Sequence, residues 1–184
     1  MRCAAPLPQG LAIQQATRED LELLKPFEER RSQETLSRWL SRGYILVLAK
    51  QTDGRVVAFH CISHEHPYPV LLRRAVPLRA AEVWLAETYL LPEWRGNGLY
   101  EHLKGAADRL AQARGFTRAV GTVQVQNLAS RKANARIGSR EIGRLWFFST
   151  RWGRGCLVWR NAVDGRPGCL GVVTTHRSWM LSTR

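Results

Sequence analysis

A glycine-rich turn between an apolar strand and an amphipathic helix constrains the fold more than any other feature of this sequence. Residues 82–91 (EVWLAETYLL) are mostly apolar and predict a buried strand, which Pro92 ends. Residues 99–114 repeat apolar side chains at steps of four and three, which predicts a helix with one buried face: Leu99, Leu103, Ala106, Leu110 and Ala113. The glycines of Arg95-Gly96-Asn97-Gly98 allow the sharp bend between strand and helix.

The rest of the chain interleaves further strands and helices around this segment. Apolar runs at 44–50 and 55–62 flank Asp53-Gly54, which predicts a β-hairpin. The other expected elements are strands at 11–17, 116–126, 141–151 and 155–163, and helices that begin at Thr17, at 32–42 and at 128–137. This order predicts an α/β domain over residues 1–163 with one mixed sheet of about seven strands and helices on both faces. Residues 164–184 are poorly patterned and are expected to form a C-terminal extension.

Charge and cysteine content limit the class of partner and the compartment. The formal net charge is +13: residues 1–92 carry 12 basic and 10 acidic side chains, and residues 93–184 carry 16 and 5. A basic second half favours an anionic partner, such as CoA or nucleic acid, although 24 of the 28 basic residues are Arg and Arg richness can reflect genome composition alone. No CxxC pair occurs, so neither a zinc site nor a disulfide framework is expected from the four cysteines, Cys3, Cys61, Cys156 and Cys169. A reducing, cytoplasmic setting is expected, without a signal peptide or a membrane span.

The turn suits a phosphate group. Its amide N–H groups and the start of the following helix provide partial positive charge, and Arg95 adds a cation. A Walker A loop is excluded, because Leu99-Tyr100 stands where Lys-Ser/Thr is needed. A dinucleotide fingerprint is excluded because Glu101 replaces its third glycine. A glycine turn that binds no ligand remains the alternative.

With these residues in place, the segment LLPEWRGNGLYEHL resembles the acyl-CoA signature of the GNAT superfamily of N-acyltransferases, Gln/Arg-x-x-Gly-x-Gly/Ala. Arg95 and Gly98 match the signature, and Tyr100 replaces its last small residue. The segment NLASRKANARIG resembles the next block of the family, whose Asn, small residue and Gly correspond to Asn127, Ser130 and Gly138.

The resemblance implies acetyl-CoA or another acyl-CoA as co-substrate and no metal. It implies a V-splayed sheet in which strands 82–91 and 116–126 diverge, with pantetheine between them. The Leu90 amide would polarise the thioester carbonyl. The implied cofactor-binding residues are Tyr89, Leu90, Leu91, Arg95, Gly96, Asn97, Gly98, Leu99, Tyr100, Asn127, Ser130 and Asn134.

Two positions bear on the acid–base chemistry of direct acyl transfer. Glu87 shares a strand face with Leu85 and Tyr89, and a half-buried carboxylate there would have a raised pKa and could act as the base, directly or through water. The alternative is a structural carboxylate paired with an arginine. The family often carries a general-acid Tyr seven residues after the motif Asn, where this chain has Asn134. Asn cannot act as the acid, so the CoA thiolate is expected to leave unaided.

The long loop 63–81 is the candidate acceptor site. Its arginines would favour an acceptor with a carboxylate or phosphate. His64 or His66 could bind the substrate or act as a base, and the alternative is that they are solvated loop histidines. The candidate acceptor-site residues are His64, His66, Tyr68, Arg73 and Arg74. The expected acceptor is the primary amine of a small molecule, and the expected state is a monomer or homodimer. Two alternatives stay open: an acetyltransferase of a macromolecule associated with RNA or the ribosome, and an inactive module that binds acyl-CoA or nucleic acid.

Overall fold

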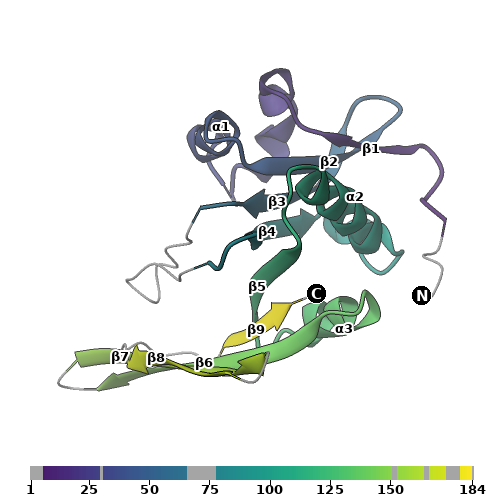
Figure 1. Cartoon of the computed structure of the whole chain (residues 1–184). Helices are drawn as coiled ribbons and strands as arrows, with labels where there is room; N and C mark the ends of the chain where they lie inside the picture. Colours follow the sequence, from purple (N-terminus) through teal and green to yellow (C-terminus); the bar gives the residue numbers. More distant parts are fainter. Residues whose placement is uncertain are drawn as a thin grey trace. The chain divides into compact units, whose positions relative to one another are not determined.

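The chain divides into two units, unit 1 with residues 1–64 and 85–117 and unit 2 with residues 65–84 and 118–184 (Figure 1). The computed structural model describes residues 6–29, 31–65, 78–150, 153–163, 166–172 and 179–183. The elements of unit 1 are β1 (Leu11–Gln15), η1 (Arg18–Phe27), α1 (Gln33–Ser41), β2 (Ile45–Gln51), β3 (Val56–Ser63), most of β4 (Glu82–Leu90), η2 (Pro92–Trp94) and α2 (Leu99–Ala113). Those of unit 2 are the start of β4, β5 (Arg118–Gln124), α3 (Leu128–Arg136), β6 (Arg140–Thr150), β7 (Gly153–Val163), β8 (Arg166–Val172) and β9 (Trp179–Thr183).

The expected mixed α/β class is confirmed, whereas the count of about seven strands is not. Over the described ranges the structure assigns nine strands. The two additional strands, β8 and β9, lie in residues 164–184, where the sequence pattern predicted no element. The pairing is mixed, because β4 and β5 are parallel while the neighbours β1–β2, β2–β3 and β6–β7 are antiparallel.

In unit 1, the predicted hairpin of β2 and β3 forms the centre of the sheet. Leu48 faces Phe59 in the antiparallel register, and β1 continues the sheet with Ile13 opposite Ala49. The turn follows from Gly54, whose φ of +86° is a left-handed conformation that suits glycine. Side chains on both faces of β3 are buried, so both faces of this part of the sheet are covered.

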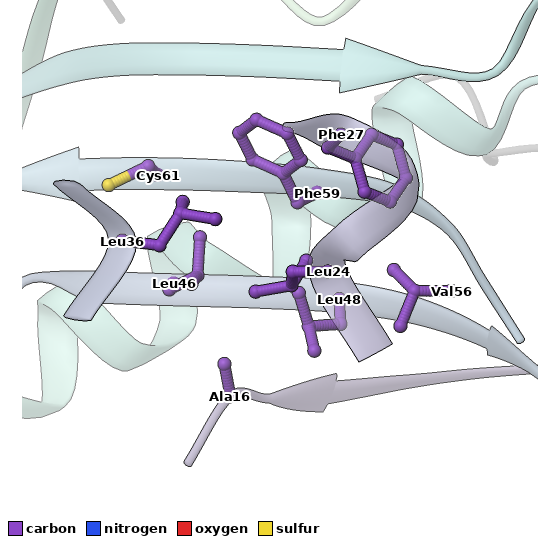
Figure 2. Packing of buried hydrophobic residues seen from close by; sticks show 9 residues of the cluster. All are labelled: Ala16, Leu24, Phe27, Leu36, Leu46, Leu48, Val56, Phe59 and Cys61. Atoms are coloured by element: carbon purple, nitrogen blue, oxygen red, sulfur yellow. The ribbon is translucent and has the colours of Figure 1, made fainter. Parts of the chain in front are cut away.

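One face of this sheet is covered by η1 and α1 (Figure 2). Phe27 of η1 packs edge-on against Phe59, with ring centroids 5.3 Å apart. Leu36 is the fully buried residue of α1. The cluster drawn in Figure 2 comprises Ala16, Leu24, Phe27, Leu36, Leu46, Leu48, Val56, Phe59 and Cys61. This packing fixes the segment after η1 against β3 and β4.

Helix α2 packs against β1, β2 and β3. Its bounds agree with the prediction, but its buried face differs from the expected one. The buried side chains are Leu99, Leu103, Lys104, Ala107 and Ala111. The expected Ala106 and Leu110 are half-buried and Ala113 is exposed. The prediction missed this because Lys104 occupies a core position, where an apolar residue was assumed.

The first two helices begin where the sequence predicted, and side chains cap both starts. Ser32 Oγ accepts the amide N–H of Thr35 at 3.3 Å at the start of α1. At the first helix, Thr17 N–H donates to Asp20 Oδ2 at 2.8 Å as part of a capping box. This first helix is a 3₁₀ helix that contains Pro26.

In unit 2, strand β9 lies between β5 and β6. Leu181 of β9 pairs with Thr122 of β5 and with Gly143 of β6, in both cases antiparallel. The end of the chain therefore completes the hydrogen bonding of two strands that are far from it in sequence. In the described part of the chain, no helix is both long and apolar enough to span a bilayer.

Candidate active site

The turn between β4 and α2 has the backbone that its glycines were expected to allow. Gly96 and Gly98 both have φ of +83°, and Gly98 is the N-cap of α2. A Cβ added to Gly96 would meet no atom within 4 Å. The chain therefore bends sharply beside open space at a helix N-terminus, a place that favours an anion.

Side chains of the turn form contacts that stabilise its conformation. Asn97 Oδ1 accepts the amide N–H of Leu99 at 3.2 Å, and Leu99 itself is fully buried. Arg95 is exposed, yet its Nε donates to the Leu90 carbonyl at 3.1 Å and its Cζ lies 5.5 Å from the centroid of the Tyr89 ring. These contacts tie the turn to the end of β4, so the two form one pre-arranged surface.

The backbone of β4 gives Leu90 and Leu91 different roles. The Leu91 amide donates to the Val57 carbonyl at 3.0 Å, so this amide belongs to the sheet. Successive amides of a strand point to opposite sides, which directs the Leu90 amide away from β3. This is the direction needed for the role expected of Leu90 at a thioester carbonyl, which stays a prediction. The Leu91 carbonyl accepts the Trp94 amide N–H at 2.9 Å, so both polar backbone groups of Leu91 have partners within the protein.

Glu87 is paired with an arginine, as the structural alternative expected, and sequence patterns did not indicate which arginine this would be. Arg31 Nε lies 2.6 Å from Glu87 Oε2. The Glu87 side chain is 17% exposed and the Arg31 side chain 44%. The predicted raised pKa of Glu87 rested on burial alone, whereas a neighbouring guanidinium favours the charged carboxylate. Arg31 was missed because it follows η1, far from β4 in sequence.

Cys61 lies beside this pair but is no candidate nucleophile. Burial raises the pKa of the Cys61 thiol, the charge of Glu87 raises it further, and Arg31 opposes the shift. The thiol is therefore protonated at neutral pH, which agrees with direct transfer rather than an acyl-cysteine on this residue.

The opposite face of β3 and β4 carries a buried polar group. His60 is 1% exposed, and its Nδ1 lies 2.5 Å from Thr88 Oγ1. Burial and the charge of Lys104 lower the pKa of His60 to about 3. Lys104 Nζ is itself buried and donates to Asp108 Oδ1 at 3.1 Å. His60 is thus a neutral core histidine, which its apolar flanks in the strand could have indicated.

In unit 2, the polar residues of the second motif are engaged within α3. Asn127 Oδ1 accepts the Ser130 amide N–H at 3.0 Å as the helix cap. Asn134 is 6% exposed, and its Nδ2 donates to the Ser130 carbonyl at 2.8 Å. These bonds account for the spacing of Asn127, Ser130 and Asn134 by local structure, and their expected contacts with CoA stay a prediction.

The expected acceptor loop is described in part. His64 is exposed and stacks near Phe116, with ring centroids 6.4 Å apart, and contacts Tyr44 edge-on at 6.0 Å. The other candidates lie outside the described residues: His66, Tyr68, Arg73 and Arg74. In the described part of the chain, no cluster of three His, Cys, Asp or Glu residues is arranged to hold a metal ion.

Comparison with known proteins identifies the family. Residues 12–138, more than half of the chain, match the model of the acetyltransferase (GNAT) family. The chain therefore belongs to the GNAT family of acetyltransferases, and as a member it is an acyl-CoA-dependent N-acetyltransferase. No curated protein shows a significant match.

Solved structures show the same fold at low sequence identity. The ribosomal-protein-S18-alanine N-acetyltransferase of Escherichia coli has a TM-score of 0.62 at 16% identity, over 94% of this chain and 92% of that chain. A GNAT-family acetyltransferase of Streptococcus pneumoniae has a TM-score of 0.62 at 18% identity, over 95% and 98%. The yncA protein of Salmonella typhimurium, solved with its cofactor acetyl-CoA, has a TM-score of 0.59 at 14% identity, over 96% and 94%.

Proposed function

We propose that this enzyme moves an acetyl or other short acyl group from acyl-CoA to the primary amine of a small molecule, in one step within a ternary complex. The observation that carries the proposal is the surface formed by the end of β4, the left-handed glycines Gly96 and Gly98, and the start of α2. This surface offers the CoA pyrophosphate a helix N-terminus and Arg95. It offers the thioester carbonyl the Leu90 amide.

The chemical step forms the C–N bond and breaks the C–S bond. The amine nitrogen attacks the thioester carbonyl, whose oxygen the Leu90 N–H stabilises. The amine loses one proton to the Glu87 carboxylate, directly or through water, and the electron pair of the C–S bond leaves with the CoA thiolate. A thiol with a pKa near 8.5 is a good leaving group. The thiolate can therefore leave without a proton from a general acid, and none is required from Asn134.

The proposal places pantetheine along the last residues of β4. The parallel ladder of β4 with β5 covers three residue pairs, from Glu82 with Arg118 to Trp84 with Val120, and ends before Tyr89 and Leu90. Pantetheine would then continue the hydrogen bonding of β4 near Tyr89 and Leu90, as an added strand edge does.

A panel of amines tests the acceptor class. The enzyme is incubated with acetyl-CoA and, separately, with amino sugars, amino acids and polyamines, and free thiol and acetylated product are measured. We expect turnover with one class of small amine that is lost in the Gly98→Val enzyme. Release of CoA without any acetylated product would contradict transfer to a small amine.

A second acceptor class is favoured by charge. Residues 93–184 carry 16 basic and 5 acidic side chains, and two structural relatives are named as ribosomal-protein alanine N-acetyltransferases. A protein N-terminus presented by an RNA-rich particle would suit such a charge. Binding of ribosomal RNA that weakens steeply between 50 and 200 mM salt, together with acetylation of a peptide amine, would favour this class over the small molecule.

A further inference from the structure

Three elements of unit 1 hold Arg31 against β4. Its backbone N–H donates to the Phe27 carbonyl at 3.0 Å, which fixes it to the end of η1. Its guanidinium carbon lies 5.9 Å from the centroid of the Trp39 ring of α1. Its Nε lies 2.6 Å from Glu87 Oε2 on β4. The position of this one cation is therefore determined by η1, α1 and β4 together.

In the described structure, the ionisable groups around Glu87 come from the segment after η1, from β3 and from β4. Arg31 approaches from the segment after η1, Cys61 lies on β3, and Tyr89 follows on the same face of β4. Cys61 is protonated, and Tyr89 packs its ring against Phe27 at 5.7 Å and has Arg95 over its face at 5.5 Å. Arg31 is the cation that forms an ion pair with Glu87 itself. The Glu87 side chain is 17% exposed, so the ion pair is in part screened from water.

We propose that Arg31 is a positioning residue, which keeps the Glu87 carboxylate ionised and oriented for the incoming amine. This inference rests on the proposed role of Glu87 in acyl transfer. A carboxylate without Arg31 at this half-buried place would become protonated more easily and would then neither accept a proton nor attract an ammonium group. With Arg31 present, the Glu87 carboxylate stays ionised at mildly acidic pH and can still accept a proton from the amine.

A merely structural ion pair would predict something different. An ion pair with a half-exposed partner contributes at most about 1 kcal/mol to stability. Loss of such a pair would lower the melting temperature slightly and would scale activity equally at every pH. A positioning role instead predicts a change in the protonation of Glu87 itself, which can be measured directly.

The first test measures that protonation by carbon NMR of side-chain carboxyl groups in protein labelled at glutamate. The Glu87 resonance is assigned by its absence from Glu87→Gln. We expect the midpoint of its titration to rise by about one pH unit or more in Arg31→Gln and to stay near the native value in Arg31→Lys, which keeps the charge. Arg38→Gln is the matched control, because Arg38 is an exposed arginine of α1 that pairs with Glu34. A Glu87 midpoint that moves by less than about 0.3 unit in a folded Arg31→Gln protein would overturn the proposal.

The second test measures the pH dependence of kcat/KM with an amine that the native enzyme acetylates. In Arg31→Gln the acidic limb is expected to move to higher pH, so that activity falls more than tenfold near pH 6 and far less near pH 8, and Arg31→Lys is expected to restore it. A profile that is lowered uniformly would overturn the proposal. An unassigned amine leaves the NMR test intact, so failure of the proposed function and failure of the Arg31 role can be told apart.

Discussion

At the scale of single residues, neighbouring positions of β3 and β4 place their side chains in two chemical environments. Cys61 and Glu87 face the side of η1 and α1, where Glu87 meets Arg31. His60 and Thr88 face the other side and contact each other in the core. The period of two in a strand thus separates a charged, partly exposed carboxylate from a buried neutral histidine.

The first residue prediction concerns Gly98. Valine at this position would have to adopt a left-handed φ of +83°, which costs about 1–2 kcal/mol, and its side chain would block the approach of a pyrophosphate. Gly98→Val is expected to abolish the stabilisation by acetyl-CoA in a melting experiment. Gly54→Val is the control, since Gly54 has φ of +86° in the β2–β3 turn and should be strained equally while it keeps the response to ligand. Loss of the response in both variants would contradict a specific role for Gly98.

The second concerns His60, whose pKa is lowered to about 3 by burial and by the charge of Lys104. Between pH 3 and the ordinary value near 6.5, the unfolded chain binds a proton here that the folded chain does not bind. The free energy of unfolding is therefore unaffected by this group above about pH 6.5 and decreases as the pH is lowered, by about 2 kcal/mol from pH 7 to pH 5. Denaturant unfolding at both pH values should show this loss, and His60→Asn should reduce it. His64→Asn, at an exposed position, should keep the native pH dependence. An unchanged dependence in His60→Asn would contradict the assignment.

The third concerns Asn134, whose Nδ2 donates to the Ser130 carbonyl within α3. Asn134→Ala is expected to lower stability by about 1 kcal/mol through the lost hydrogen bond. It should lower kcat by less than tenfold, because no proton transfer is assigned to Asn134. Lys132→Ala, an exposed position of the same helix, should change neither quantity. A thousandfold loss of kcat with acetyl-CoA binding intact would show that the thiolate does not leave unaided.

At the scale of elements, the turns and caps that depend on local residues could be predicted from the sequence. The pairing of strands that are far apart in the sequence could not. Ser32, Gly54 and Gly98 each specify their turn or cap through their own backbone or side chain, and the structure confirms all three. Strand β9 has no comparable local signal, because it is stabilised by pairing with β5 and β6. The buried face of α2 was predicted wrongly for a related reason: Lys104 is buried with its charge paired to Asp108, and a pattern of apolar residues does not include such a lysine.

An element prediction follows from the cap of α1. Ser32→Ala removes the acceptor of the Thr35 amide and is expected to destabilise the protein by about 1 kcal/mol. Ser41→Ala is the control in the same helix, since Ser41 Oγ donates to the Arg38 carbonyl at the far end and is no cap of free amides. Equal unfolding free energies of Ser32→Ala and the native protein would refute this cap as a source of stability.

At the scale of the whole molecule, the order of elements and the glycine turn were enough to predict the fold class and the family. The conformation of the glycine turn was predicted from a motif that is contiguous in sequence, and the roles of the turn and of Leu90 in binding CoA stay predictions. Arg31 could not be predicted, because its contact with Glu87 depends on how η1 and α1 fold over β4. The acceptor stays a proposal, because acceptor recognition depends on side chains that no single motif specifies.

The most direct measurement compares acetyl-CoA with S-acetyl-pantetheine, which lacks the pyrophosphate and the nucleotide. If the glycine turn binds the pyrophosphate, acetyl-CoA at 100 times its dissociation constant should stabilise the native protein by about 2.7 kcal/mol. The same concentration of S-acetyl-pantetheine should give little or no stabilisation. No shift with millimolar acetyl-CoA, or equal shifts with both compounds, would contradict the account.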